Sequence, residues 1–134
     1  VIASVSYDVI REGTDVRTMM GISPEEVAAF AQEQGADVIG TNCGTGVEME
    51  WAARILLRYR TNCDLPLLAQ PNAGKPSLQG LEVVYEESSD EFAQGVGRLV
   101  AAGARIVGAC CGSTPEHIGK MREELDSYLA AERI

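Results

Sequence analysis

Four short apolar segments alternate with four segments of helical pattern, and this alternation limits the possible folds more than any other feature of the chain. The apolar segments are rich in Val, Ile, Leu and Ala, and they are Val1–Val5, Ala36–Thr41, Leu65–Gln70 and Arg105–Ala109. Strands that are apolar on both faces are typical of a parallel sheet covered by helices. The sequence therefore predicts an α/β fold, and both a βα barrel and a doubly wound sheet agree with the alternation.

Each predicted helix begins at a recognisable capping sequence. The expected N-cap residues are Ser23, Thr45, Ser88 and Thr114. A glutamate follows each of the first three at the capping-box position, and a proline directly follows the first and the last. Apolar residues at the helical period predict that the third helix buries Phe92, Val96, Leu99 and Val100. The same period predicts that the last helix buries Ile118, Met121, Leu125 and Leu129.

An internal repeat favours the barrel. Residues 35–44 (GADVIGTNCG) match residues 103–112 (GARIVGACCG) position by position, so that Cys43 corresponds to Cys111. One complete strand-helix unit separates the two copies, which makes them alternate strands. In a βα barrel, alternate strands contribute to the same interior layer, and their carboxyl ends face a common mouth. We therefore expect a (βα)8 TIM-barrel type of fold, of which this chain supplies about four βα units.

Charge and hydropathy exclude several classes of partner. The 134 residues carry 11 Lys and Arg against 20 Asp and Glu, a formal net charge of −9. Such a charge repels polyanions, so we expect neither nucleic acid nor an anionic membrane surface as a partner. No apolar run approaches the roughly 20 residues that cross a bilayer, and no secretory leader pattern is present. The sequence thus predicts a cytoplasmic protein.

Three of the four cysteines are expected at the carboxyl ends of strands. These are Cys43, Cys110 and Cys111, whereas Cys63 precedes its strand and is expected at the opposite end of the sheet, in a packing role. A disulfide is a poor interpretation for a cytosolic chain, and adjacent cysteines form a strained bridge. Thiolate clusters instead favour zinc, and three protein ligands with an open position are typical of a catalytic zinc site. Three small buried side chains in glycine-rich turns are the alternative interpretation.

Three motifs resemble those of the homocysteine S-methyltransferase family. They are GTNCG at residues 40–44, QPNAGKP at residues 70–76 and GACCGSTPEHI at residues 108–118. The resemblance extends from about Ala3 to Leu125 and is strongest to the homocysteine-binding module of cobalamin-dependent methionine synthases. It implies a (βα)8 barrel with zinc on one cysteine after the sixth strand and two after the eighth, here Cys43, Cys110 and Cys111.

The resemblance also implies a role for Asn72 as the candidate catalytic residue. Its side-chain oxygen would fill the fourth metal position until the substrate thiol displaces it; an ordinary turn residue is the alternative. Gly74 and Lys75 of the same motif are expected to shape the pocket wall, and the lysine is a candidate for the substrate carboxylate.

Other polar residues carry weaker expectations. Asp8 ends the first strand, where it either faces the mouth or caps a loop. His117 in the first turn of the last helix is expected to be exposed, and residues 85–87 are expected to form a solvated approach to the third helix. Gly44, Gly46 and Gly112 are expected to allow tight turns beside the metal.

The implied reaction is methyl transfer to the thiol of homocysteine, which forms methionine. Zinc would hold the substrate as a thiolate and fix its position for attack on the methyl group. In relatives with the most similar motifs the methyl group comes from methylcobalamin, a cofactor on a separate module that methyltetrahydrofolate recharges. Other relatives use betaine or S-methylmethionine, and these residues do not decide between the donors.

Four βα units correspond to the second half of the family's barrel, so we expect residues 1–134 to form the C-terminal half of a homocysteine-binding domain. The first half, which in the family recognises the amino end of homocysteine, has no counterpart in these residues. The expected partners are therefore homocysteine, a methyl donor or its carrier module, and either the N-terminal half barrel or a second copy of the chain. The alternative function is a non-catalytic half barrel that binds zinc or thiols.

Overall fold

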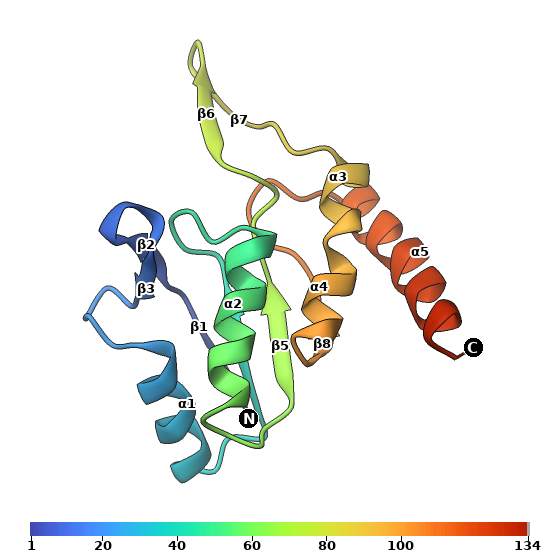
Figure 1. Ribbon diagram of the computed structural model, residues 1–134. Coiled ribbons are helices and arrows are strands. Elements are labelled where there is room, and N and C mark those ends of the chain that lie inside the picture. The colour runs from blue at the N-terminus through green and yellow to red at the C-terminus, as the bar shows by residue number, and fades with distance from the viewer. Residues whose placement is uncertain (134) are drawn as a thin grey trace.

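The computed structural model describes residues 1–133 and contains a four-stranded parallel sheet, five helices and two β-hairpins (Figure 1). The sheet consists of β1 (Ile2–Val5), β4 (Val38–Asn42), β5 (Leu67–Gln70) and β8 (Ala104–Val107). The helices are α1 (Pro24–Glu33), α2 (Met49–Arg60), α3 (Ser89–Gln94), α4 (Val96–Ala101) and α5 (Pro115–Glu132). The hairpins pair β2 (Asp8–Ile10) with β3 (Asp15–Arg17), and β6 (Pro76–Gln79) with β7 (Glu82–Tyr85), and a short 3-10 helix, Arg11–Gly13, joins β2 to β3.

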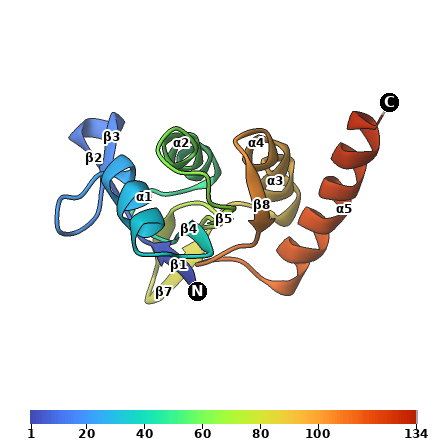
Figure 2. The same cartoon turned by 90° about the horizontal axis from the view of Figure 1, so that it is seen from below.

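The four strands lie side by side in chain order, β1-β4-β5-β8, and every neighbouring pair is parallel. Figure 2 shows that α1, α2, α3 and α4 lie on one side of this sheet and that α5 lies beyond its β8 edge. A doubly wound sheet has helices on both faces, so this alternative is wrong for the described residues. The predicted strand-helix alternation is confirmed, and β4 and β8 are alternate strands, as the repeat predicted.

The core lies between the sheet and helix α2. Ile39, Ala69, Ile55 and Leu56 are fully buried there, the first two on strands and the others on the helix. On the opposite face, Leu68 fills the space beside Gly40, where an added Cβ would lie 2.8 Å from the leucine Cβ. None of the helices within residues 1–133 has the length and apolar character needed to cross a membrane.

Three of the four predicted helix starts are confirmed. Ser23 and Ser88 form capping boxes with Glu26 and Glu91, and Thr114 is the N-cap of α5. The start at Thr45 is wrong, because the N-cap of α2 is Glu48, three residues later.

The displaced start of α2 has a backbone cause. Gly44 and Gly46 have φ values of 92° and 77°, which hold this segment in a loop. The N–H of Thr45 donates to Asp8 Oδ1 at 2.9 Å, and its carbonyl accepts from Val9 N–H at 2.9 Å. Since both backbone groups of Thr45 are bonded to the β2 segment, they are not available to a helix.

Two expectations about the later helices are corrected. The predicted third helix is two helices, α3 and α4, which meet at Gly95, where the backbone passes close to Met49. In α5, Met121 is buried, but Ile118 and Leu129 are exposed, because this helix packs on α3 and α4 beyond the edge of the sheet (Figure 1).

The two hairpins are additions that the strand-helix pattern did not predict. In β6–β7 the two-residue turn places Gly80 first, with φ 68°, between the paired residues Gln79 and Glu82. A glycine at that position is typical of tight hairpin turns, so Gly80 was an available sequence signal.

An arginine from α2 anchors the β2–β3 hairpin. Arg58 donates from Nη1 to Asp15 Oδ1 at 3.0 Å and from Nη2 to Glu25 Oε2 at 2.7 Å, and so links β3 to α1. Arg17 adds a second ion pair to Asp15 at 3.0 Å. These contacts hold the hairpin against the body of the protein, where Asp8 reaches the loop before α2.

A pair of buried tyrosines joins α2 to the sheet. The Tyr59 hydroxyl lies 2.8 Å from the Tyr7 hydroxyl and 3.2 Å from the carbonyl oxygen of Gly40. Burial raises the pKa of Tyr7 to about 12 and the pKa of Tyr59 further, so both hydroxyls stay protonated. The pair therefore acts as a fixed hydrogen-bonded link beneath the strand that leads to Cys43.

The Tyr59→Phe substitution is expected to lower the free energy of unfolding by about 1–2 kcal/mol, because it leaves the Gly40 carbonyl and the Tyr7 hydroxyl without this partner. Tyr128→Phe is the matched control, since that hydroxyl bonds only the exposed Glu132. Urea denaturation of both variants measures the difference. Equal stabilities for the two variants would contradict the role of the buried pair.

Candidate metal centre

The segment that follows β5 lies between the two cysteine turns and hydrogen bonds to both. Cys43 N–H donates to the Gln70 carbonyl at 3.2 Å, and Cys110 N–H donates to the Pro71 carbonyl at 2.9 Å. Ala73 N–H donates to the Cys111 carbonyl at 2.9 Å. The middle strand of the three thus aligns the cysteines that the sequence places far apart.

The three predicted cysteines come together at the carboxyl end of the sheet. The Sγ atoms of Cys43 and Cys111 are 3.5 Å apart, and all three Sγ atoms lie within 4.8 Å of one another. They form the one candidate metal-binding cluster of His, Cys, Asp and Glu side chains within residues 1–133. Cys63 is buried in the core and is not a member of this cluster, as expected.

The turn that presents Cys43 has an unusual backbone. Cys43 has φ 54°, a left-handed conformation that non-glycine residues seldom adopt, and Gly44 follows with φ 92°. A Cβ on Gly44 would lie 1.8 Å from the carbonyl oxygen of Tyr7. The turn therefore requires glycine at position 44, both for its conformation and for the close approach of the β1–β2 segment.

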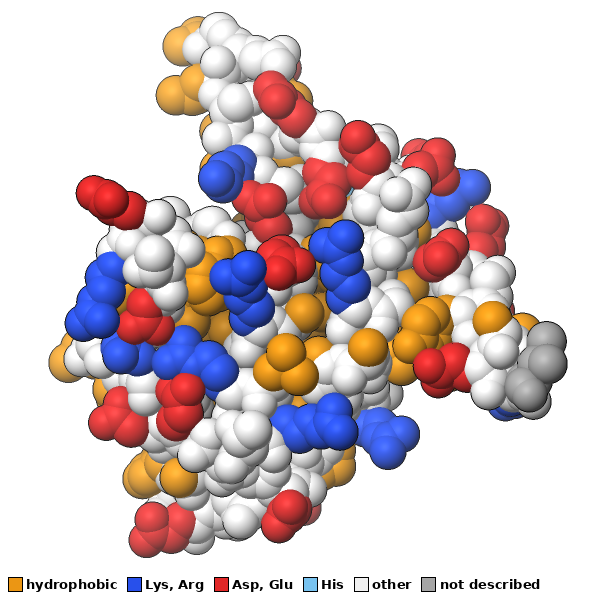
Figure 3. Space-filling view, in the orientation of Figure 1, with side chains coloured by type: hydrophobic (Ala, Val, Ile, Leu, Met, Phe, Trp, Pro, Cys, Tyr) orange, Lys and Arg blue, Asp and Glu red, His pale blue; other side chains and the backbone are white. Residues whose placement is uncertain are grey.

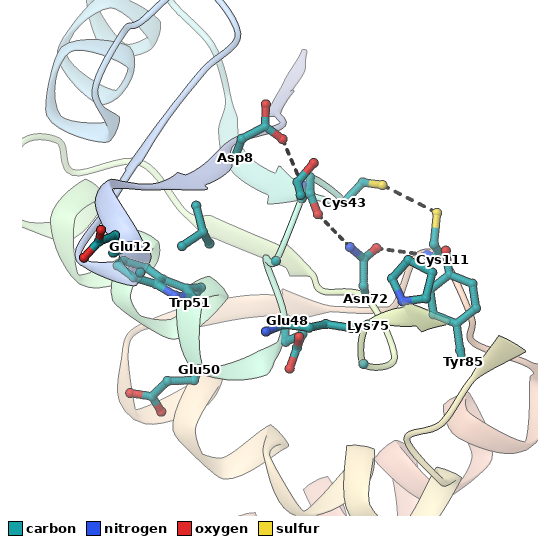
Figure 4. A pocket seen from close by; sticks show the side chains of 17 residues that line it. Asp8, Glu12, Cys43, Glu48, Glu50, Trp51, Asn72, Lys75, Tyr85 and Cys111 are labelled. Atoms are coloured by element: carbon teal, nitrogen blue, oxygen red, sulfur yellow. Dashed lines mark hydrogen bonds between the residues drawn. The ribbon is translucent and has the colours of Figure 1, made fainter. Parts of the chain in front are cut away.

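The second cysteine turn contacts the β6–β7 hairpin. Gly112 has φ 80°, and a Cβ there would lie 2.2 Å from Cγ of Tyr85. The aromatic ring thus lies directly over this turn, beside Cys111 (Figure 4). The expected tight turns at Gly44, Gly46 and Gly112 are confirmed.

The thiols differ in acidity. Burial acts to raise the pKa of Cys43, but hydrogen bonds from the Gly44 N–H and from the other two thiols outweigh it and lower the pKa below its ordinary value. Burial, together with the hydrogen bond to Cys43 and its charge, raises the pKa of Cys110 to about 11. In the absence of metal, Cys43 therefore ionises before Cys110.

Asn72 lies between the two turns and is 7% exposed. Its Nδ2 donates to the carbonyl of Gly44 at 2.9 Å, and its Oδ1 accepts from the N–H of Cys111 at 3.2 Å. Figure 4 shows the amide between these two turns. The sequence predicted the position of Asn72 at the site, but not that both ends of its amide are hydrogen bonded.

A cavity of about 870 Å³ opens beside the cysteines (Figure 4). Its wall includes side chains from the β2 segment, from the loop before α2 and from the β6–β7 hairpin, among them Asp8, Glu48, Trp51, Lys75 and Tyr85, together with Cys43, Asn72 and Cys111. Asp8 both lines the cavity and caps Thr45, so its two expected roles coexist. Lys75 lies on the wall, as expected.

A smaller cavity of about 470 Å³ shares Glu48, Gly74 and Lys75 with the first. Figure 3 shows acidic side chains gathered beneath the β6–β7 hairpin, and Glu87 belongs to this group. Burial, and then the charges of Glu48 and Glu91, raise the pKa of Glu87. The solvated approach predicted for residues 85–87 is therefore wrong for Tyr85 and Glu87, which are both partly buried.

His117 is buried, at 8% exposure, so its predicted exposure is wrong. Its Nδ1 accepts from the N–H of Thr114 at 3.2 Å, which leaves the proton on Nε2 to face the Glu87 carbonyl at 3.2 Å. The ring also packs edge-on against Phe92. His117 thus joins the start of α5 to the segment before α3, at a distance from the cysteines.

Glu48, Trp51 and Tyr85 are among the wall residues that were not identified from the sequence. Glu48 fits the capping-box position after Thr45, and Trp51 and Ile55 have the helical spacing of a buried stripe, so neither position predicts a place on the cavity wall. For Tyr85 the signal was the hairpin turn at Gly80, because a two-residue turn brings the end of β7 back to the start of β6, next to Lys75.

Comparison with known proteins agrees with the motifs. The sequence profile of the family described as homocysteine S-methyltransferase matches residues 1–125. The methionine synthase of Mycobacterium tuberculosis is 37% identical over 101 residues, and that of Mycobacterium leprae is 35% identical over 102 residues. These matches cover 74% and 75% of this chain but only 8% of each relative, so the chain spans a small part of their length.

Solved structures show the same fold. The homocysteine methyltransferase MmuM from Escherichia coli superimposes with a TM-score of 0.60 in its oxidized form and in its apo form. The identities are 23% and 24%, and the matches cover 79% and 80% of this chain. They cover 31% and 34% of the MmuM chains, so these residues adopt the fold of about a third of that protein.

In the metal-free protein at about pH 8, iodoacetamide is expected to modify Cys43 at least about tenfold faster than Cys110, because the thiolate is the reactive form. The Cys110 rate should keep rising with pH towards its pKa of about 11. Peptide mass spectrometry of timed samples measures both rates. Cys63 is the internal control, since it is buried and should react only after unfolding. Equal rates for Cys43 and Cys110 at pH 8 would contradict the assignment.

Proposed function

Because the chain belongs to the homocysteine S-methyltransferase family, we propose that it forms the part of such an enzyme that binds zinc and activates the thiol of homocysteine for methyl transfer. The observation that carries the proposal is the convergence of Cys43, Cys110 and Cys111, of which Cys43 and Cys111 line a cavity. Three thiols with room beside them suit a metal that keeps one position for substrate.

The donor set and its spacing fit zinc. Tetrahedral zinc with thiolate ligands at about 2.3 Å places the sulfurs about 3.8 Å apart. The Sγ atoms of Cys43 and Cys111 are 3.5 Å apart, so small side-chain rotations suffice to reach that spacing. The pKa of Cys43 is lowered and that of Cys110 is raised, so Cys43 would lose its proton before Cys110.

Each residue at the site has a distinct task in this proposal. Cys43, Cys110 and Cys111 would hold the metal as thiolates, and the Asn72 oxygen would fill the remaining position until substrate displaces it. Bound zinc lowers the pKa of the substrate thiol so that it is a thiolate at neutral pH. The cavity beside Cys111, walled by Tyr85, keeps the substrate next to this position.

We propose Lys75 as the partner of the substrate carboxylate. It lines the cavity, and among residues 1–133 it forms no ion pair. The other charged groups of the wall are acidic, including Asp8, Glu12, Glu48 and Glu50, so Lys75 is the cation of this cavity. An amino-acid substrate with a carboxylate and an ammonium group would complement both signs of charge.

We further propose that residues 1–134 act as the C-terminal half of a βα barrel. The sheet has helices on one face only (Figure 2), and Ile2 and Ile106 on its two edge strands are 57% and 42% exposed. An N-terminal half barrel would pair with both edges, and a second copy of the chain is the alternative partner. By the same resemblance, the methyl donor would be methylcobalamin on a separate module, betaine or S-methylmethionine.

Homocysteine is expected to add a fourth sulfur ligand to the zinc-loaded protein. Zinc X-ray absorption, recorded with and without excess homocysteine, counts the ligands. A change from three to four sulfurs supports thiol activation. An unaltered spectrum would contradict it and favour the non-catalytic zinc-binding module, for which the metal is structural. Serine in place of homocysteine is the control, because it offers the same amino-acid groups without a thiol.

The Cys111→Ser substitution is expected to weaken zinc binding by more than about 100-fold, because it removes one of three thiolate ligands. Cys63→Ser is the matched control and should leave the affinity unchanged, since Cys63 lies in the core and not in the cluster. Competition with a chromophoric chelator measures both affinities. Loss of zinc from the Cys63 variant, with its fold retained by circular dichroism, would show that the ligand set is wrong.

A further inference from the structure

The backbone alone aligns only part of the metal centre. The Gln70 and Pro71 carbonyls accept from Cys43 and Cys110, and Ala73 donates to the Cys111 carbonyl. No backbone acceptor within residues 1–133 pairs with the Cys111 N–H. That N–H is taken by a side chain, Oδ1 of Asn72, at 3.2 Å.

The other end of the same amide holds the opposite turn. Nδ2 of Asn72 donates to the Gly44 carbonyl at 2.9 Å, directly after Cys43. Asn72 itself is fixed at its backbone, because its N–H donates to the Val47 carbonyl at 3.2 Å. Since the side chain is 7% exposed, water has little access to compete for either hydrogen bond. One planar amide therefore spans the two cysteine turns (Figure 4).

We propose that Asn72 is a positioning residue, and that its amide sets the separation of Cys43 and Cys111 before any metal binds. The Cys43 turn is the one that needs support, because Cys43 has the left-handed φ of 54°. A donor on one side and an acceptor on the other hold the two turns at one spacing, and the sulfurs lie 3.5 Å apart across it. This inference rests on the metal centre of the proposed function and adds a second task for Asn72.

The two tasks of Asn72 make opposite predictions for Asn72→Asp. A carboxylate keeps an oxygen acceptor for Cys111 and is a stronger metal ligand than an amide oxygen. However, a carboxylate has no donor for the Gly44 carbonyl. It would place a carboxylate oxygen against the carbonyl oxygen of Gly44, and the two would repel each other. If Asn72 acted only as a ligand, the aspartate variant would bind metal as tightly as the unmodified protein or more tightly.

Co²⁺ serves as a coloured substitute for zinc in this test. The positioning role predicts that Asn72→Asp weakens Co²⁺ binding by at least about tenfold and that Asn72→Ala does the same. Chelator competition measures the affinity, and the thiolate-to-cobalt charge-transfer bands should lose intensity or shift as the sulfur geometry relaxes. Asn42→Ala is the matched control, because Asn42 directly precedes Cys43 but its side chain bonds Ser4. Unchanged affinity and bands in the aspartate variant would overturn the proposal.

A measurement on the unmodified, metal-free protein covers the case in which the variants do not fold. The amide hydrogen of Cys111 and the side-chain NH₂ of Asn72 should exchange with solvent well below free-peptide rates in NMR spectra. Exchange of the Cys111 amide at the free-peptide rate would overturn the inference. Failure of the proposed function is a separate result: Co²⁺ would then show no three-sulfur spectrum in the unmodified protein, whatever the exchange rates.

Discussion

The hydrogen bonds made by residues 70–73 are the interaction on which the site depends. Parallel strands deliver their loops to one edge of a sheet, but they do not by themselves bring two particular side chains within 4 Å of each other. Here Gln70, at the end of β5, offers its carbonyl to Cys43 on one side, and Pro71 offers its carbonyl to Cys110 on the other. Backbone hydrogen bonds between the strands thus continue past the ends of the sheet. They fix the positions of the turns that carry the cysteines.

This arrangement also orders the thiols by their chemistry. Cys43, in its left-handed turn beside Gly44, has hydrogen bonds that favour the thiolate. Burial and the neighbouring Cys43 raise the pKa of Cys110, so this thiol keeps its proton at neutral pH in the absence of metal. A divalent cation would displace that proton, because metal binds the deprotonated thiolate.

The sequence predicted what depends on local rules and missed what depends on distant partners. The caps at Ser23 and Ser88 follow from side-chain and backbone groups within one turn, and both are confirmed. The cap at Thr45 had the same local pattern, but Asp8, 37 residues earlier, takes its N–H. His117 also looked exposed by position, since nothing local indicates that α3 covers it. The cysteine cluster was predictable because the internal repeat, a long-range signal, is itself written in the sequence.

The order of the strands has a consequence for how the chain reaches its final state. Each strand of the parallel sheet pairs with the sheet strand that precedes it in the chain. The strand-helix units can therefore be added one after another, and each addition closes only the loop of one unit. Cys43 and Cys111 are 68 residues apart, on the second and the fourth strand units. The three sulfurs converge only when β8 has paired with β5, which is the last step of such a sequence. Metal would therefore bind the complete four-stranded sheet in preference to partly folded chains. By mass action, this binding would stabilise the folded state.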